Sequence, residues 1–236
     1  MSDKQSVRER IWQRIDSDPD IRTPRSAWGR IPGFAGDEAA AARLAELPEW
    51  RAARVLKLNP DTPQLPVRVR AIEQGKLLYM AVPKLASPLP FFALQQANLS
   101  VPAHEAATIE GSSRHGVPTR LEHMLPIELI VCGSVAVSLN GVRIGKGAGY
   151  ADLEFALLLD LGLISEHTQI ATTVHDVQVL DEALPETRHD FRVDWIATPT
   201  RLLACPRVPR PPGLLWQELD PAQIAAIPVL GSRAKE

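Results

Sequence analysis

A glycine-rich segment, residues 141–152, carries the residue types with which this chain could do chemistry. It reads Gly-Val-Arg-Ile-Gly-Lys-Gly-Ala-Gly-Tyr-Ala-Asp, so glycines alternate with two cations, a tyrosine and a carboxylate. An apolar run precedes it, and a segment rich in helix-forming residues follows it. A glycine-rich loop between a strand and a helix can bind phosphate through backbone N–H groups and the helix N-terminus. The segment therefore predicts a nucleotide or phosphate site.

The side chains within this loop refine the prediction. Arg143 and Lys146 add positive charge, and Asp152 is a candidate magnesium ligand. The spacing differs from the Walker pattern, because no Gly-Lys-Ser/Thr closes it, and it is not a clear dinucleotide fingerprint. Alternating glycines also occur in ordinary turns, so that interpretation stays open beside the phosphate site.

Two other segments offer groups that could complete such a site. Asp190, in a second polar stretch, is a candidate magnesium ligand, since Mg²⁺ is usually held by one or two carboxylates and by phosphates. The alternative is a solvated loop in which the acid caps a turn. Lys4 and Arg8 share one face of a predicted helix and could reach a phosphate tail, with Lys57 joining them. The alternative is that these cations only solvate the surface.

Composition and remaining motifs exclude several classes of protein. The net charge of −2 does not suggest general affinity for nucleic acid. Two cysteines make no disulfide framework, and the histidines show no zinc-ligand spacing. Neither cysteine nor Ser134 lies in a nucleophile signature, so serine and cysteine hydrolysis are set aside. Without a leader or an apolar run of about twenty residues, we expect a cytoplasmic protein with no membrane partner.

Apolar periodicity predicts strands that alternate with helices, and this order favours a three-layer α/β domain. The prolines of residues 83–117 suggest long surface connections, and Asp220 is expected to cap a last short helix. We expect one α/β domain over residues 1–204 and a proline-rich extension over residues 205–236, packed on that domain. The predicted helices cover residues 2–15, 36–47, 65–74 and 151–164, and the predicted strands lie within residues 54–58, 77–82, 127–137, 168–174, 177–180 and 193–197.

The glycine-rich segment resembles the phosphate loop of 5-formyltetrahydrofolate cyclo-ligases, also called methenyltetrahydrofolate synthetases. Three further segments are similar to that family: the Lys4/Arg8 helix, the Gly75-Lys76 element before Pro83, and the stretch from Gln178 through His189-Asp190 to Val193-Asp194. The likeness extends to about residue 200. It looks closest to a divergent branch of "methenyltetrahydrofolate synthetase domain-containing" proteins.

The resemblance implies an α/β/α fold with a mixed, mainly parallel sheet, of the kind shared with sugar-phosphate isomerases and coenzyme A transferases. It also implies an ATP- and Mg²⁺-dependent ligase that converts 5-formyltetrahydrofolate to 5,10-methenyltetrahydrofolate by phosphorylating the formyl oxygen and closing the ring. Arg143 and Lys146 become the candidate catalytic residues, with Asp152 and Asp190 on magnesium. Tyr150 and Gln64 are the candidate substrate-binding residues. The ATP site then comprises Lys4, Arg8, Arg143, Ile144, Gly145, Lys146, Gly147, Ala148, Gly149, Tyr150 and Ala151.

Three positions depart from the family pattern. Ala151 stands where the family has a second tyrosine, Leu153 where it has a basic or polar residue, and Gln64 is the nearest candidate for a folate-contacting glutamate. Two alternatives therefore remain: a non-catalytic module that binds a nucleotide or folate, and an ATP-dependent enzyme that acts on another small molecule.

Overall fold

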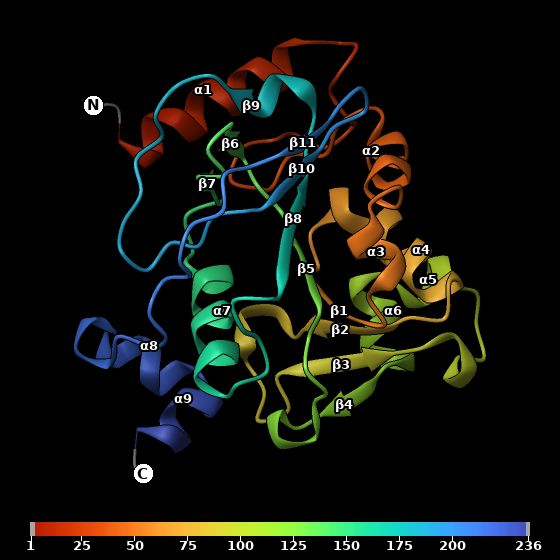
Figure 1. Ribbon diagram of the computed structural model, residues 1–236, viewed down its shortest axis with the longest axis vertical. Coiled ribbons are helices and arrows are strands. Elements are labelled where there is room, and N and C mark those ends of the chain that lie inside the picture. The colour runs from red at the N-terminus through yellow and green to blue at the C-terminus, as the bar shows by residue number, and fades with distance from the viewer. Residues whose placement is uncertain (1–2, 235–236) are drawn as a thin grey trace.

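The fold was analysed in a computed structural model that describes residues 3–234. An eight-stranded sheet crosses the molecule from top to bottom in Figure 1. Its strands are β1 (Val55–Leu58), β2 (Leu77–Ala81), β3 (Phe91–Leu94), β4 (Val117–Thr119), β5 (Leu129–Cys132), β8 (Gln169–Thr173), β10 (Trp195–Ala197) and β11 (Leu202–Ala204).

The sheet is mixed and mainly parallel, as predicted. Its order is β11-β10-β8-β5-β1-β2-β3-β4. The five strands from β10 to β2 run parallel, whereas β11 at one edge and β3 and β4 at the other are antiparallel. The central strands β5 and β1 are almost wholly buried, as expected for parallel strands covered on both faces.

Helices cover both faces of this sheet and make the predicted three layers. One face carries α2 (Asp37–Leu44), α3 (Pro48–Ala52), α4 (Leu65–Glu73), α5 (Ala103–Ala106) and α6 (Ile109–His115), and the other carries α7 (Tyr150–Asp160), α8 (Pro221–Ala226) and α9 (Pro228–Arg233). Successive strand residues point to opposite faces. Leu129 and Val131 accordingly pack with the α2–α5 side, while Ile130 and Cys132 pack with α7. The hydrophobic core is therefore divided into two layers by the sheet.

A smaller sheet places the N-terminal helix. It consists of β6 (Ala136–Ser138), β7 (Arg143–Ile144) and β9 (Val179–Leu180), in the order β7-β6-β9. Helix α1 (Lys4–Ser17) begins after Asp3, whose carboxylate accepts a 2.7 Å hydrogen bond from the Ser6 N–H. Its buried apolar side belongs to the same cluster as residues of β6 and β7. This packing holds α1 beside the strand that leads into the glycine-rich loop (Figure 1).

The expectation that residues 83–117 form long surface connections is wrong, because this stretch contains β3, α5 and α6 and leads into β4. Prolines in this stretch and directly after it occupy positions where a missing N–H is tolerated. Pro102 is the N-cap of α5, and Pro118 lies in the edge strand β4. Proline therefore marks element boundaries and a sheet edge here, and not an unstructured segment.

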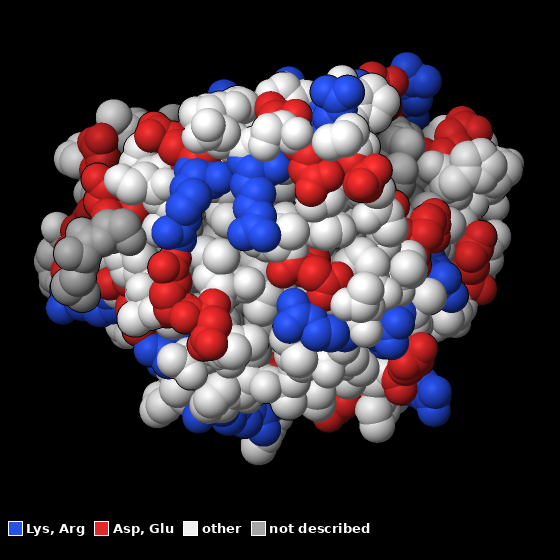
Figure 2. Space-filling view, turned by 90° about the horizontal axis from the view of Figure 1, so that it is seen from above, with Lys and Arg blue, Asp and Glu red and all other residues white. Residues whose placement is uncertain are grey.

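The C-terminal segment is packed onto the α7 side of the molecule. Asp220 caps α8 as predicted, and its carboxylate accepts a 2.8 Å hydrogen bond from the Ala222 N–H. Ile227, Val229 and Leu230 are buried in the same cluster as α7. Among the helices of residues 3–234, none is long and apolar enough to cross a membrane. On the face seen in Figure 2, basic and acidic side chains are interspersed.

Candidate functional site

A cavity of about 610 Å³ lies beyond the carboxyl ends of three central strands. The residues that directly follow these strands line the cavity. They are Asn59, Pro60 and Asp61 after β1, residues 82–84 after β2, and Gly133 after β5. The chain passes from β1 to β2 on one side and later enters β5 on the other. Doubly wound sheets bind ligands at such a point, where the strand order reverses direction. The sheet topology therefore identifies this cavity as the candidate binding site.

The glycine-rich loop forms the wall of this cavity at the N-terminus of α7. Residues 145–149 all line it. Gly147 and Gly149 have φ values of 105° and 71°, a left-handed backbone that favours glycine. Gly149 is the N-cap of α7 and makes no side-chain cap hydrogen bond. Within the described chain, the N–H groups of residues 146–149 donate to no protein acceptor. The loop thus presents free amides and a helix N-terminus to an anion.

Helix α1 brings two cations to the same loop. The Arg8 Nε donates a 2.7 Å hydrogen bond to the Gly145 carbonyl, and its guanidinium packs against Gly147. Partial burial lowers the pKa of Arg8, although Asp190 and Asp3 oppose that shift. Lys4 forms an ion pair with Asp190. Lys4, Arg8 and Asp190, from opposite ends of the sequence, therefore meet at one side of the cavity.

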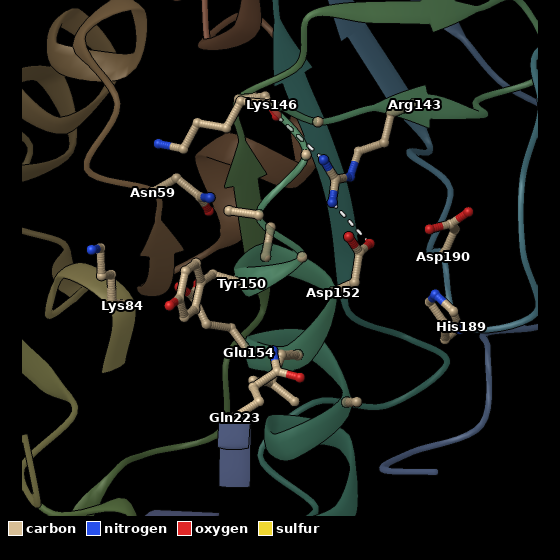
Figure 3. A pocket seen from close by; sticks show the side chains of 18 of the residues that line it. Asn59, Lys84, Arg143, Lys146, Tyr150, Asp152, Glu154, His189, Asp190 and Gln223 are labelled. Atoms are coloured by element: carbon tan, nitrogen blue, oxygen red, sulfur yellow. Dashed lines mark hydrogen bonds and ion pairs between the residues drawn. The ribbon is translucent and has the colours of Figure 1, made fainter. Parts of the chain in front are cut away.

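Arg143 is the most enclosed cation of the site (Figure 3). Its guanidinium lies over the Phe191 ring at 4.2 Å and donates a 2.9 Å hydrogen bond to Asp152. Burial by itself would lower the pKa of Arg143, but the Asp152 carboxylate raises it above the ordinary value. Arg143 is consequently a permanent, fixed positive charge at the wall of the cavity.

Lys146 links the loop to the end of β1. Its Nζ lies 2.8 Å from the Asp61 carboxylate. Arg68 fixes the turn that carries Asp61 by donating hydrogen bonds of 2.6 and 2.9 Å to the Asn59 and Asp61 carbonyls. Burial lowers the pKa of Arg68 to about 10. Arg68 therefore fixes the turn at one rim of the cavity, and no pattern in the sequence indicated this role.

The two aspartates predicted to bind magnesium both line the cavity. Asp152 uses Oδ1 for Arg143, and Asp190 uses Oδ2 for Lys4 and Thr187. Burial alone would raise the pKa of Asp190, but its hydrogen bonds with Lys4 and Thr187 lower it. In residues 3–234 the other oxygen of each carboxylate makes no hydrogen bond. Each can therefore give one oxygen to a cation whose other ligands come from phosphate and water, which is the usual environment of Mg²⁺.

No group of three or more His, Cys, Asp or Glu side chains in the described part of the chain could hold a metal ion by itself. The aspartates therefore fit an ion that arrives with a polyphosphate better than a resident metal.

Gln64 does not line the cavity, although it was a candidate substrate-binding residue. It is completely buried, and its Nε2 donates hydrogen bonds to the Thr173 carbonyl and hydroxyl at 3.1 and 3.0 Å. A Cβ atom added at Gly133 would lie 2.9 Å from Gln64 Oε1. Gln64 is thus enclosed behind Gly133, because the 3₁₀ turn Thr62–Gln64 directs it into the core.

Lys57 does not join the cations at the loop either. It is buried and paired with Glu154, and it also donates a 2.8 Å hydrogen bond to Asn59. Glu154 lies on the cavity side of α7, beyond Tyr150 in Figure 3. The alternation of a strand places Lys57 on the face opposite Leu56 and Leu58. The alternation was visible in the sequence, but it could not identify Glu154, the partner of Lys57, which lies 97 residues further along the chain.

Other residues of the cavity had no recognisable signal in the sequence. Lys84 lies at the rim with φ of 60°, a strained value for a side chain other than glycine. The C-terminal segment also reaches the cavity, through Gly213, Leu214, Leu215, Glu218, Leu219 and Gln223.

Comparison with known proteins agrees with this architecture. The sequence profile described as "5-formyltetrahydrofolate cyclo-ligase family" matches residues 1–199. The fold is similar to the NMR structure of Aquifex aeolicus 5,10-methenyltetrahydrofolate synthetase, with a TM-score of 0.56 and 21% identity. That match covers 92% of this chain and 99% of the other.

Vertebrate relatives cover nearly the whole chain. The methenyltetrahydrofolate synthase domain-containing protein of Mus musculus is 41% identical over 233 residues, which is 96% of this chain. The Homo sapiens protein of that name is 38% identical over 240 residues, which is 99% of this chain. Each alignment spans 62% of the relative's own length. On the profile match over residues 1–199, the chain belongs to the 5-formyltetrahydrofolate cyclo-ligase family.

Proposed function

We propose that this protein converts 5-formyltetrahydrofolate to 5,10-methenyltetrahydrofolate, with ATP as the phosphoryl donor and Mg²⁺ as its counter-ion. The observation that carries the proposal is the meeting of the uncapped α7 N-terminus with Lys4, Arg8, Arg143 and Lys146 at one cavity. Family membership supports folate as the second substrate. Unsatisfied amides and fixed cations are the groups that a polyphosphate requires.

The chemistry proceeds in two steps. The formyl oxygen attacks the γ-phosphorus of ATP, the bond to the bridging oxygen breaks, and ADP leaves. N10 then attacks the activated formyl carbon, loses its proton, and expels inorganic phosphate as the ring closes. Phosphoryl transfer depends on alignment and on compensation of negative charge more than on a protein nucleophile. The residues of the cavity are suited to that role.

Each cation has a distinct part in this proposal. Arg143 is held in place by Asp152 and Phe191, so its charge needs no reorganisation during the reaction. Lys146 and the amides of residues 145–149 bind the polyphosphate from the loop side. Lys4 and Arg8 cover it from α1. Tyr150, at the first turn of α7, lines the adjoining substrate space.

Asp152 and Asp190 would hold the magnesium ion through their oxygens without hydrogen bonds. When bound, Mg²⁺ would supply positive charge that offsets the negative charge of the phosphates. The two carboxylates also orient Arg143 and Lys4, so the same acids serve the cations and the metal.

The direct test is the ATP-dependent rise of methenyltetrahydrofolate absorbance with purified protein, followed together with ADP release. We expect both products in equal amounts. Absence of both would overturn the enzymatic proposal.

One observation favours a second candidate, a module that binds a nucleotide or folate without turnover. Gln64, the nearest candidate for the folate-contacting group, is enclosed behind Gly133. Calorimetric binding of Mg·ATP without formation of methenyl product would support this candidate against the ligase.

A further inference from the structure

The C-terminal segment forms one wall of the cavity. Gly213, Leu214, Leu215, Glu218, Leu219 and Gln223 line it and are called the tail wall below. The family profile ends at residue 199, so the tail wall lies outside the matched family region. The human relative aligns over 99% of this chain, so its alignment includes the segment.

The tail wall is anchored at both ends. Before it, the side chain of Arg210 is buried and donates 2.7 Å hydrogen bonds to Asp194 and to the Thr168 carbonyl. After it, α9 buries Val229 and Leu230 in the core. A loose tail would have no such buried contacts, so this segment is a fixed part of the site.

Gly213 makes the closest contact between the tail wall and α7. The Leu214 N–H donates a 3.2 Å hydrogen bond to Asp160 Oδ2. A Cβ atom at position 213 would lie 1.5 Å from Asp160 Oδ1. Only glycine leaves room for this carboxylate, and Asp160 is the last residue of α7.

Leu214 and Gln223 of the tail wall lie toward the end of the cavity away from the phosphate loop, whereas Glu218 lies 4.0 Å from His189, next to Asp190. The loop meets α7 at Gly149, whereas the tail meets it at Asp160. From Tyr150 to Ala156, both at the cavity, the helix rises about 9 Å at 1.5 Å per residue. In Figure 3, Lys146 and Arg143 lie on one side of Tyr150, and Gln223 lies on the other side, beyond Glu154. The cavity therefore has two chemically different ends.

Charge and polarity separate these ends. The loop end holds Lys4, Arg8, Arg143 and Lys146. The tail wall contributes three leucines, the Gln223 amide and the Glu218 carboxylate, which is paired with Arg188. Glu154 on α7 also lines this part of the cavity, but its charge is balanced by the buried Lys57. Apolar surface with a single amide suits a flat ring with hydrogen-bonding edges better than a polyanion.

We propose that the tail wall binds the heteroaromatic ring end of the folate substrate and determines specificity for it, while the loop end binds ATP. This inference rests on the proposed function for the identity of the ring. It adds a binding surface that lies outside the matched family region.

The first test compares two glycine substitutions in the tail. Gly213→Ala forces the Asp160 carboxylate away and removes the partner of the Leu214 N–H. Gly231→Ala is the control, because its new Cβ would lie 3.4 Å from the Ile224 carbonyl, an ordinary contact. We expect Gly213→Ala to weaken 5-formyltetrahydrofolate binding about tenfold in calorimetry. Mg·ATP affinity and the affinities of Gly231→Ala should stay within about twofold of wild type.

A second measurement needs no variant. In hydrogen exchange of the wild-type protein, 5-formyltetrahydrofolate alone should protect residues 213–223, and Mg·ATP alone should protect residues 145–152. The tail-wall proposal would be overturned if Mg·ATP protected the loop but 5-formyltetrahydrofolate did not protect the tail. It would also be overturned if Gly213→Ala bound folate as tightly as wild type. Either result would leave the proposed function intact. Failure of wild type to bind either substrate would overturn both.

Discussion

The guanidinium of Arg143 donates a 2.9 Å hydrogen bond to the carboxylate of Asp152, which lies on the first turn of α7. The two residues flank the glycine-rich loop, so their ion pair closes the loop at its base. Removing either member changes both the position of the loop and the charge that an anion meets.

Arg143→Ala should weaken Mg·ATP binding by more than tenfold, because the loop loses its buried charge and Asp152 loses its partner. Arg143→Lys should restore only part of the affinity, since an ammonium lacks the planar fork of donors and the contact with the Phe191 face. Isothermal titration calorimetry provides the comparison. Wild-type affinity in Arg143→Ala would remove the loop from the nucleotide site.

Gln64→Glu should destabilise the protein without altering folate affinity. The new carboxylate would lie in a fully buried position, with the Gly133 region packed against it. Burial of an unpaired carboxylate raises its pKa and costs stability, on the order of 2 kcal/mol or more. Urea unfolding at neutral pH would detect the loss. A stable variant with changed folate affinity would place Gln64 in contact with substrate and contradict its assignment to the core.

The buried pair of Lys57 and Glu154 should be sensitive to the removal of one partner. Glu154→Leu leaves a buried ammonium without its counter-ion, and the expected loss is about 3–5 kcal/mol. The double variant Lys57→Met/Glu154→Leu should recover much of that loss, because apolar groups of similar size can replace a buried ion pair. Chemical denaturation of the two single variants and the double variant gives the coupling energy. Additive effects would argue against a direct interaction.

Stability should fall in acid partly through Asp190. Its pKa is lowered in the folded state by Lys4 and Thr187, relative to an ordinary value of 3.8. The folded state therefore binds the Asp190 proton less tightly than the unfolded state does. The resulting stabilisation is complete above the unfolded pKa and is lost as the pH falls through the lower, folded pKa.

The matched experiment compares wild type with Asp190→Asn in urea at pH ~6 and pH ~3. The variant should be less stable than wild type at the higher pH, and the difference should shrink at the lower pH. A constant difference would mean that Asp190 does not titrate differently on folding.

Local patterns predicted the features that depend on local sequence. The strand–loop–helix around Gly145 and Gly149 was predicted because glycine, cations and a helix start lie next to one another in the chain. The approach of α1 to that loop was suggested by the shared helix face of Lys4 and Arg8 and by the family resemblance. The helix spacing alone showed which face of α1 is apolar, and not which partner that face covers.

The remaining features required long-range pairing. The buried position of the Gln64 side chain depends on its contacts with Gly133 and Thr173, which are distant in sequence. The ion pair of Lys57 depends on Glu154 in the same way. The tail wall was not predicted, because prolines gave no periodic signal and the contact of Gly213 with Asp160 exists only in three dimensions.

The outermost strand of the large sheet has a consequence for solubility. Proline is confined in sheets to positions where an inter-strand donor is not needed, and Pro118 stands in the middle of the three-residue β4. The free border of β4 therefore offers no unbroken row of N–H groups, although Val117 beside it is exposed. A strand from a second molecule finds a poor template there, so this proline protects the border from β-type aggregation.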